Sequence, residues 1–280
     1  MSMLRAPMPL AHALVSPPSG TPRRWMLFLH GILGSGANWR SFARALVTAR
    51  PEWGAVLVDL RLHGESTTGF DPPHTVPAAA ADVHELFALV PGPVRGVLAH
   101  SFGGKVALAL TERVAGDLDH VFVIDATPGA RPDARGSEST KHIVDLLSGL
   151  PPEFPDREAF IRYIEERGVT RPTAMWLAMN VRPVPNTTRF VFRIDVDAVR
   201  ALLDDYFVRD LWPVLEHPPG TFRAHLVVGG RSTVVDDAER ERARRCPRTT
   251  VDVIESAGHW VHADAPDALR EVVLARLDEP

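Results

Sequence analysis

Short apolar runs alternate with longer amphipathic stretches from Arg24 to Asp125. The first run, Arg24 to Leu29, is too short for a helix and is bounded by proline and glycine, so it predicts a buried strand. The longer stretches have helical periodicity. Strands and helices that alternate at this spacing predict a doubly wound, mostly parallel sheet. The predicted strands are 24–29, 55–60, 94–98 and 120–125, and the predicted helices are 38–49, 76–89 and 102–115.

The alternation stops at residues 126–129 and resumes near residue 221. Between these points the pattern is helical and broken by prolines, with one candidate short strand at 190–192. We therefore predict an α/β core of residues 1–127 and 220–280, with a mainly helical lid inserted as residues 128–219. The predicted helices of the insert are 139–147, 156–167, 173–179 and 197–207, and the elements after it are strands 221–228 and 249–254 and helices 236–246 and 266–277.

One turn carries a chemical signal. Residues 99–103, Ala-His-Ser-Phe-Gly, are a variant of the G-x-S-x-G nucleophile elbow. A serine on a sharp strand-to-helix turn needs small neighbours two residues before and after it, because the two backbones nearly touch. Gly103 meets this demand, and Ala99 adds one methyl group where glycine is usual. The motif alone is weak, since many helices begin with a serine cap before a glycine.

Composition places the chain among ordinary soluble globular enzymes, with 45% hydrophobic and 24% charged residues. The net charge of −4 has no basic block, so no nucleic-acid partner is expected. The single cysteine, Cys246, excludes an intramolecular disulfide and favours a reducing compartment. Residues 1–15 lack the pattern of a secretory signal, and no stretch approaches the ~20 apolar residues of a membrane span. We expect a cytoplasmic protein.

Four polar motifs follow predicted strands, where a parallel sheet binds its ligands. They are the His30-Gly31 turn, Ser101, Asp125 and the loop with His259. Serine is a weak nucleophile, so it needs a base within hydrogen-bond reach and a third group that orients the base. Serine, aspartate and histidine occur here in the chain order of the α/β-hydrolases. Neither paired ligands at zinc spacing nor a G-x-G-x-x-G after a strand is found, so no metal or nucleotide cofactor is expected.

The chain resembles the α/β-hydrolases, and within them the small esterases related to alpha/beta-hydrolase domain-containing protein 11. The resemblance implies the α/β-hydrolase fold and serine-dependent hydrolysis of carboxylic esters or thioesters through an acyl-enzyme, without a metal or organic cofactor. The least similar part is the insert. The stretches that carry the resemblance are 30–35, 59–66, 100–105, 123–128 and 257–264.

The resemblance also implies the roles of the residues. Ser101 would be the nucleophile, and His259 would be the general base and then the general acid. The oxyanion hole would use the backbone amides of Ile32 and of Phe102, the residue after the nucleophile. His100 and His30 are expected to be structural, and Lys105 is expected to pack or to form an ion pair.

The position of the acid departs from the common pattern. Most α/β-hydrolases carry the acid after the penultimate strand in a Gly-x-x-Asp turn, but here residues 229–232 read Gly-Gly-Arg-Ser. Asp236 and Asp237 follow at a predicted helix start, where aspartate commonly caps a helix. Asp125 ends the strand after the elbow helix, a position that some hydrolases use. Our hypothesis is the triad of Ser101, His259 and Asp125, with Asp236 and Asp237 as the alternatives.

Large apolar residues of the insert either form its own core or line the site. If they face the serine, they form an apolar pocket that suits small to medium acyl groups. The candidates for substrate binding are Trp176, Met179, Phe207 and Trp212. Two other interpretations stay open at this point. The same triad could serve C–C bond hydrolysis, acyl transfer or perhydrolysis, or the chain could be a non-catalytic ligand-binding protein on a hydrolase fold.

Overall fold

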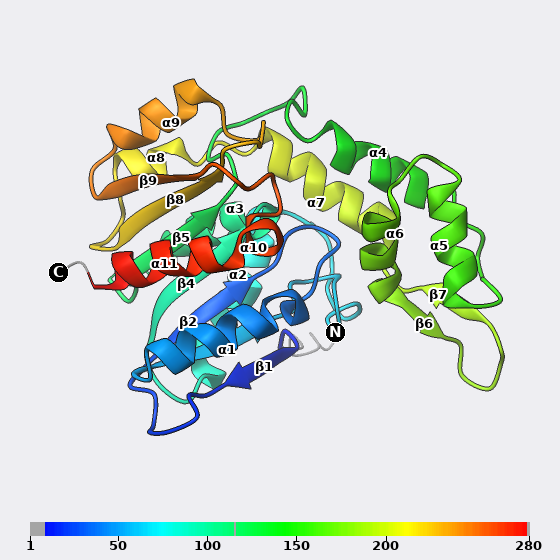
Figure 1. Ribbon diagram of the computed structural model, residues 1–280, viewed down its shortest axis with the longest axis horizontal. Helices are drawn as coiled ribbons and strands as arrows, with labels where there is room; N and C mark the ends of the chain where they lie inside the picture. Colours follow the sequence, from blue (N-terminus) through cyan, green and yellow to red (C-terminus); the bar gives the residue numbers. More distant parts are fainter. Residues whose placement is uncertain (1–8, 115, 279–280) are drawn as a thin grey trace, which may run out of the picture.

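A seven-stranded sheet forms the centre of the molecule (Figure 1). The computed structural model describes residues 9–114 and 116–278. The first strand pairs antiparallel with its neighbour and every other pair is parallel, so the predicted doubly wound, mostly parallel sheet is confirmed. In spatial order the strands are β1 (His12–Val15), β3 (Trp53–Val58), β2 (Arg24–Leu29), β4 (Val94–His100), β5 (His120–Ile124), β8 (Arg223–Gly229) and β9 (Thr249–Ile254).

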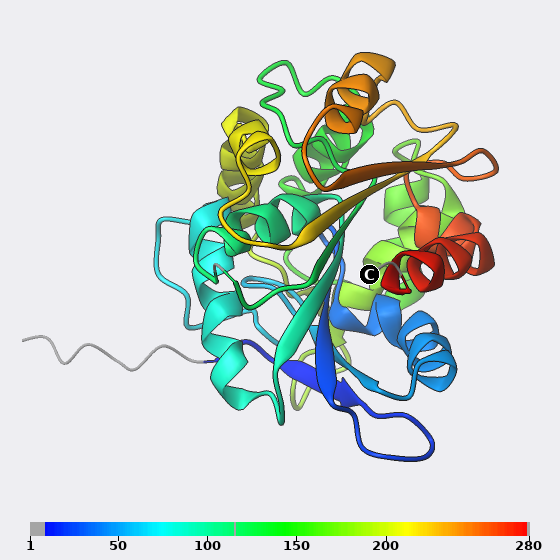
Figure 2. The ribbon, with the colours of Figure 1, turned by 90° about the vertical axis from the view of Figure 1, so that its left-hand side faces the viewer.

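Helices cover both faces of the sheet, which explains why its central strands are mostly apolar. In Figure 2 the sheet is seen with α1 (Arg40–Ala49) and α11 (Pro266–Leu277) on one side and α2 (Val76–Glu85) and α3 (Phe102–Thr111) on the other. Every residue of β3 and of β5 is buried. Strands of a parallel sheet that are buried on both faces read as continuous apolar runs, and this is the signal that located them.

Residues between β5 and β8 form the insert. Most of it lies to the right of the sheet in Figure 1, and its last helix lies above β8. The strand predicted at 190–192 is present and pairs antiparallel with a strand that the sequence did not predict. The boundaries of the core and the lid as domains stay a prediction. The elements of the insert are α4 (Glu138–Leu147), α5 (Arg157–Glu165), α6 (Arg171–Leu177), β6 (Val181–Pro183), β7 (Phe190–Phe192), α7 (Val196–Val208) and α8 (Trp212–Glu216).

Several predicted boundaries were wrong, mostly because residues at helix ends form 3₁₀ turns and not α-helix. A 3₁₀ turn over Gly36–Trp39 precedes α1, and another over Leu86–Leu89 follows α2. The strand predicted at 55–60 lies two residues earlier, and α3 ends at Thr111. Strand β1 was not predicted, because it lies at the edge of the sheet and its residues are mostly exposed. The last elements are α9 (Asp237–Arg244) and α10 (Val261–Asp264) before α11.

Within residues 9–114 and 116–278, none of the helices combines the length and the apolarity that a membrane crossing requires. In the same residues, no three His, Cys, Asp or Glu side chains are grouped so that they could hold a metal ion. The expectation for a signal segment concerns residues 1–15, of which residues 1–8 lie outside the described part.

Candidate active site

Ser101 lies in the turn between β4 and α3, with a backbone that serine rarely adopts. Its φ is +52° and its ψ is −119°. The turn is held by hydrogen bonds from the Ser101 amide to the carbonyl oxygen of Ile124 (3.0 Å) and from the Gly104 amide to that of Ser101 (2.8 Å). Gly103 is required, since a Cβ there would stand 2.6 Å from the carbonyl oxygen of His30. The steric demand that identified the elbow in the sequence is therefore real.

Asp125 and His259 meet beside this turn. The Nδ1 atom of His259 lies 2.7 Å from Oδ2 of Asp125. Asp125 follows β5 with φ of +45° and has no solvent exposure. Its Oδ1 accepts from the Gly229 amide at 3.0 Å, and its Oδ2 also accepts from Ser232 Oγ at 2.5 Å. Burial of a carboxylate is costly unless hydrogen bonds compensate it, and here three donors do so.

Asp236 and Asp237 lie elsewhere and contact other groups. Asp236 caps α9 by accepting from the Glu239 amide at 2.9 Å, and it forms an ion pair with Arg131 at 3.1 Å. The side chain of Asp237 is 97% exposed and pairs with Arg240 at 3.3 Å. The structure therefore brings Asp125 to His259, and it gives the two alternatives the capping and surface roles that are usual at a helix start.

Ser101 and His259 line one cavity of about 340 Å³, which includes its open mouth. Of the four insert residues predicted to bind substrate, Trp176 lines this cavity. Its ring packs against Trp260, with ring centroids 4.7 Å apart. The other lining residues are Gly31, Ile32, Leu33, His100, Thr140, Ile143 and Trp260.

Several of these lining residues, among them Trp260, Thr140 and Ile143, were not assigned to the site from the sequence. Trp260 follows His259 directly, so its position in the chain could have suggested it. Thr140 and Ile143 lie three residues apart on α4, which places them on one face of that helix. The sequence pattern of α4 does not tell whether that face meets the insert's own core or the serine.

Met179, Phe207 and Trp212 are not brought to the serine. Phe207 packs edge-on against Tyr206, with ring centroids 5.4 Å apart. Trp212 is 3% exposed, and the guanidinium of Arg242 lies 4.3 Å from its ring centroid. Met179 is 43% exposed and lines a separate polar pocket. None of these three residues lines the cavity that Ser101 shares with His259.

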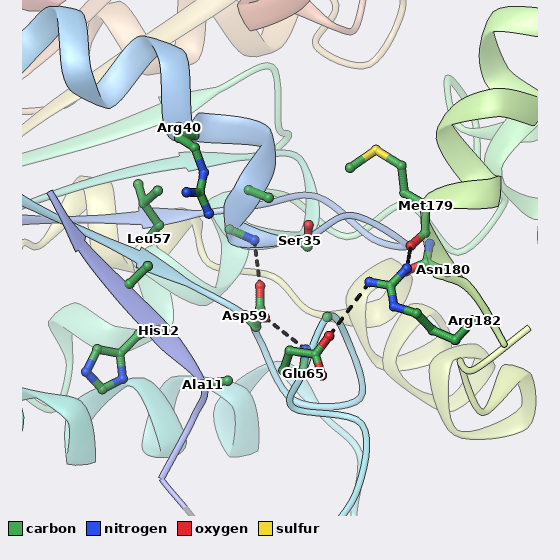
Figure 3. A pocket seen from close by; sticks show the side chains of 14 residues that line it. Ala11, His12, Ser35, Arg40, Leu57, Asp59, Glu65, Met179, Asn180 and Arg182 are labelled. Carbon is green, nitrogen blue, oxygen red and sulfur yellow. Dashed lines mark hydrogen bonds and ion pairs between the residues drawn. The ribbon is translucent and has the colours of Figure 1, made fainter. Parts of the chain in front are cut away.

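This separate pocket, shown in Figure 3, is lined in part by residues 35–37 of the segment that follows β2. Asp59 is at its floor, where one carboxylate oxygen accepts from the Gly36 amide at 2.7 Å and the other accepts from the Glu65 amide at 2.9 Å. Arg182 pairs with Glu65 across the pocket at 3.7 Å. These contacts join the 31–36 loop to the loop after β3. They therefore hold in place the loop backbone that passes Ser101.

The 31–36 loop passes very close to the serine. A Cβ on Gly31 would stand 2.9 Å from Nδ1 of His100 and 3.3 Å from Cβ of Ser101. Ile32 follows in this loop, and its amide donates to no protein atom within residues 9–114 and 116–278. Phe102 is the first residue of α3, where helix amides lack partners within the helix. Both predicted oxyanion-hole amides thus belong to backbone beside Ser101.

Burial keeps the surrounding histidines neutral. Desolvation lowers the pKa of His30 to about 4, and it lowers the pKa of His262 to about 4 as well. It holds the pKa of His100 well below its ordinary range. His30 braces the loop as predicted: its Nδ1 donates to the Gly31 carbonyl at 2.7 Å, and its Nε2 accepts from the Leu60 amide at 3.0 Å. The structural role expected for His30 is confirmed.

Comparison with known proteins gives consistent results. Residues 26–272 match the alpha/beta hydrolase family. The chain is 30% identical over 284 residues to sn-1-specific diacylglycerol lipase ABHD11 of Mus musculus, covering 97% of this chain and 86% of that protein. It is 27% identical to esterase YbfF of Escherichia coli strain K12, covering 91% and 93%.

Solved structures have the same fold at low identity. A marine microorganism esterase superposes with a TM-score of 0.81 at 21% identity, over 95% of this chain and 98% of that one. The thioesterase domain from the curacin biosynthetic pathway superposes with a TM-score of 0.68 at 19% identity, over 94% of each chain. At these identities the two structures show the fold alone.

Proposed function

Since the chain belongs to the alpha/beta hydrolase family, we propose that it is a serine hydrolase that cleaves carboxylic ester or thioester bonds of small to medium acyl substrates. The observation that supports this most is the 2.7 Å contact between His259 Nδ1 and the buried Asp125 carboxylate, beside a cavity that Ser101 and His259 share. The printed names of the two relatives, a lipase and an esterase, support ester hydrolysis.

In the first half of the reaction, Ser101 Oγ attacks the acyl carbonyl carbon while His259 Nε2 takes its proton. Asp125 holds the Nδ1–H of His259, which fixes the tautomer and stabilises the imidazolium that forms. The negative oxygen of the tetrahedral intermediate accepts hydrogen bonds from the amides of Ile32 and Phe102. His259 then protonates the leaving alcohol or thiol, and the acyl group stays on Ser101.

In the second half, His259 takes a proton from water, and the hydroxide attacks the acyl carbon. The tetrahedral intermediate uses the same two amides, and the carboxylic acid leaves as His259 returns the proton to Ser101. Ile143, Trp176 and Trp260 form the apolar wall of the cavity and would contact the acyl group. This wall supports a preference for small to medium apolar acyl groups.

Labelling with a fluorophosphonate tests the proposal. The wild-type protein should take up one phosphonyl group per chain, on Ser101, and should hydrolyse p-nitrophenyl esters. Ser101→Ala should keep the fold, take up no label and lose at least ~10³-fold in turnover. A folded wild-type protein that is inert towards the probe and towards activated esters would falsify the proposal, and so would labelling at another residue.

A further inference from the structure

The hydroxyl group of Thr140 has no role in the reaction proposed above. Thr140 belongs to α4 of the insert and lines the cavity of Ser101. Resting on the proposed function, we propose that Thr140 donates a hydrogen bond to an uncharged oxygen substituent of the acyl group. The preferred substrates are then esters of short alkoxy, hydroxy or oxo acids, and plain fatty-acid esters of the same length are cleaved more slowly.

The polar groups of Thr140 are available to a ligand. In the part of the chain that the structure describes, neither its hydroxyl nor its amide has a hydrogen-bond partner. A threonine in a helix can turn its hydroxyl back to a carbonyl three or four residues earlier, but Thr140 does not do so. The residue is half-buried. A molecule in the cavity can therefore pair with this hydroxyl without displacing a protein partner.

The position of Thr140 in α4 favours the donor role of its hydroxyl. Thr140 is the third residue of the helix, and the preceding cap residue, Ser137, makes no side-chain cap hydrogen bond. The N–H groups at a helix start have no partners within the helix and carry a partial positive charge. An electron-rich oxygen is favoured in that field. The expected partner of Thr140 is thus an acceptor oxygen of the ligand.

The other hydroxyl and imidazole groups around the cavity are already used. Ser101 and His259 take part in the proposed reaction. His100 donates from Nε2 to the His259 carbonyl oxygen at 2.8 Å. Its Nδ1 is buried, and a Cβ on Gly31 would stand 2.9 Å from it, so the loop backbone closes this nitrogen off. The hydroxyl of Thr140 is therefore the one that is left to bind a substituent of the substrate.

The lining of the cavity favours a substituent without charge. Among the described residues that line it there is no Lys, Arg, Asp or Glu. A carboxylate, phosphate or ammonium group on the acyl chain would lose its hydration there without meeting an opposite charge, which is costly. An ether, hydroxyl or keto oxygen needs a single donor. Apolar pockets commonly orient their ligands through a few polar groups of this kind.

The place of Thr140 on its helix assigns the oxygen to the acyl chain. Thr140 and Ile143 lie three residues apart on one face of α4. Ile143 belongs to the wall that the proposed function gives to the acyl group. The volume of about 340 Å³, open mouth included, suits a short chain. The acyl group that fits these contacts is therefore short and apolar, with an oxygen in the chain or on it.

The experiment compares three p-nitrophenyl esters of equal chain length, namely the pentanoate, the 3-methoxypropanoate and the ethoxyacetate. In the last two an oxygen replaces one methylene group, at two different positions. Thr140→Val keeps the shape of the side chain and loses the hydroxyl. At the position that Thr140 reads, the ratio of kcat/KM between the oxygen ester and the pentanoate should fall by about 3- to 10-fold in this variant. Thr140→Ser keeps the hydroxyl and should retain the ratio.

The intrinsic reactivity of the esters cancels, because each variant is compared with the wild type on the same substrates. Ser139→Ala is the matched control on α4: it changes an exposed neighbour outside the cavity and should retain both ratios. If Thr140→Val has the wild-type ratio for both oxygen esters, the inference is wrong.

Two indole N–H groups are the alternative donors. Trp176→Phe and Trp260→Phe remove them one at a time and should keep the preference for oxygen. A preference that is lost in either of these variants and kept in Thr140→Val would assign the hydrogen bond to an indole and contradict the role of Thr140.

A second pair of esters tests the acyl assignment. Butyl butanoate and 2-methoxyethyl butanoate make the same exchange of methylene for oxygen in the alcohol. Their ratio of kcat/KM should be equal in the wild type and in Thr140→Val. A fall in this ratio alone would place the recognised oxygen in the alcohol, against the inference.

Failure of this inference can be told from failure of the proposed function. The wild-type protein is labelled with the fluorophosphonate in the same series. If it does not react at Ser101, the proposed function is wrong and the inference falls with it. If it reacts and turns over esters while Thr140→Val retains the wild-type ratios, only the inference is wrong.

Discussion

The cavity at Ser101 is built by two regions that contribute different things. The core supplies Ser101, Asp125 and His259, and hydrogen bonds between strand ends hold their loops in place. The insert supplies Thr140, Ile143 and Trp176, which reach the cavity by packing alone. The proposed function assigns the chemistry to the core and the acyl selectivity to the insert, so we expect the two to be separable.

One buried side chain joins the two regions. Lys105, in α3, donates from Nζ to the carbonyl oxygens of Gly129 (2.7 Å), Tyr206 (2.6 Å) and Arg209 (2.8 Å). Gly129 lies where the insert leaves the core, and the other two lie at the end of α7. Lys105 was expected to pack or to form an ion pair. Packing is confirmed, because its side chain is fully buried and its Nζ lies 4.4 Å from the ring centroid of Tyr206, and its three donors are used on backbone carbonyls.

The largest effect should come from Asp125, the proposed acid in the core. Asp125→Asn should lower kcat by about 10³- to 10⁴-fold, because an amide cannot hold His259 in the required tautomer. Asp236→Asn and Asp237→Asn are the matched controls and should stay within a few fold of the wild type. The comparison is made with kcat for a p-nitrophenyl ester. Near-full activity of Asp125→Asn, with a collapse in one of the others, would overturn the assignment.

The next effect tests the core's backbone donors. Ile32→Pro removes one amide hydrogen and should lower kcat by about 10²- to 10³-fold. Ile32→Ala keeps the amide and serves as the control, which should retain most of the turnover. Folding is checked by thermal unfolding of both variants. Equal kcat in the two would mean that this amide does not stabilise the oxyanion.

A smaller effect is expected from the wall that the insert provides. Trp176→Ala enlarges the cavity and should shift the ratio of kcat/KM between longer and shorter p-nitrophenyl esters by about 10-fold towards the longer ones. Met179→Ala changes the same segment away from the cavity and should leave the ratio as it is. An unchanged ratio in Trp176→Ala would show that the wall does not select the acyl group.

The smallest effect concerns the pH dependence of the free energy of unfolding. Here a buried histidine of the core is compared with an exposed histidine of the insert. Burial lowers the pKa of His63 to about 3. Below pH 6.5 the unfolded chain therefore binds a proton that the folded chain does not, and the free energy of unfolding falls by about 1.4 kcal/mol per pH unit for this group. His63→Gln should reduce the loss between pH 6.5 and 4.5 by the share of this one group, while the other buried histidines keep theirs, as measured by urea unfolding.

His142 is the control for this measurement, because it is exposed on α4 of the insert. His142→Gln should keep the pH dependence of the wild type. A wild-type protein whose unfolding free energy does not change between pH 6.5 and 4.5 would contradict the account of the buried histidines.

The sequence predicted those parts of the site whose physical demands are local. The elbow could be found because the turn at Ser101 needs a small residue at position 103, and the whole motif lies within residues 99–103. Asp125 could be placed because it directly follows a buried strand. Both residues could therefore be located from the local sequence, without knowledge of contacts between distant segments.

The remaining contacts depend on how distant segments meet. Helical periodicity marks which residues of the insert are buried, but it does not tell what they face. The same pattern selected Phe207, Trp212 and Trp176 as candidates. It could not tell that Trp176 lines the cavity while Phe207 and Trp212 lie away from it. The contact between Ser232 and Asp125 joins residues 107 positions apart. The turn of residues 229–232 was recognised as the usual place of the acid, but the sequence does not tell that its serine contacts Asp125.

The most direct test of the proposed acyl-enzyme is mass spectrometry of protein quenched with acid during turnover of p-nitrophenyl acetate. The account predicts one acetyl group per chain, located on Ser101, and a release of p-nitrophenol that Ser101→Ala abolishes. Steady hydrolysis with no acetyl group on Ser101, or an undiminished rate in Ser101→Ala, would contradict it.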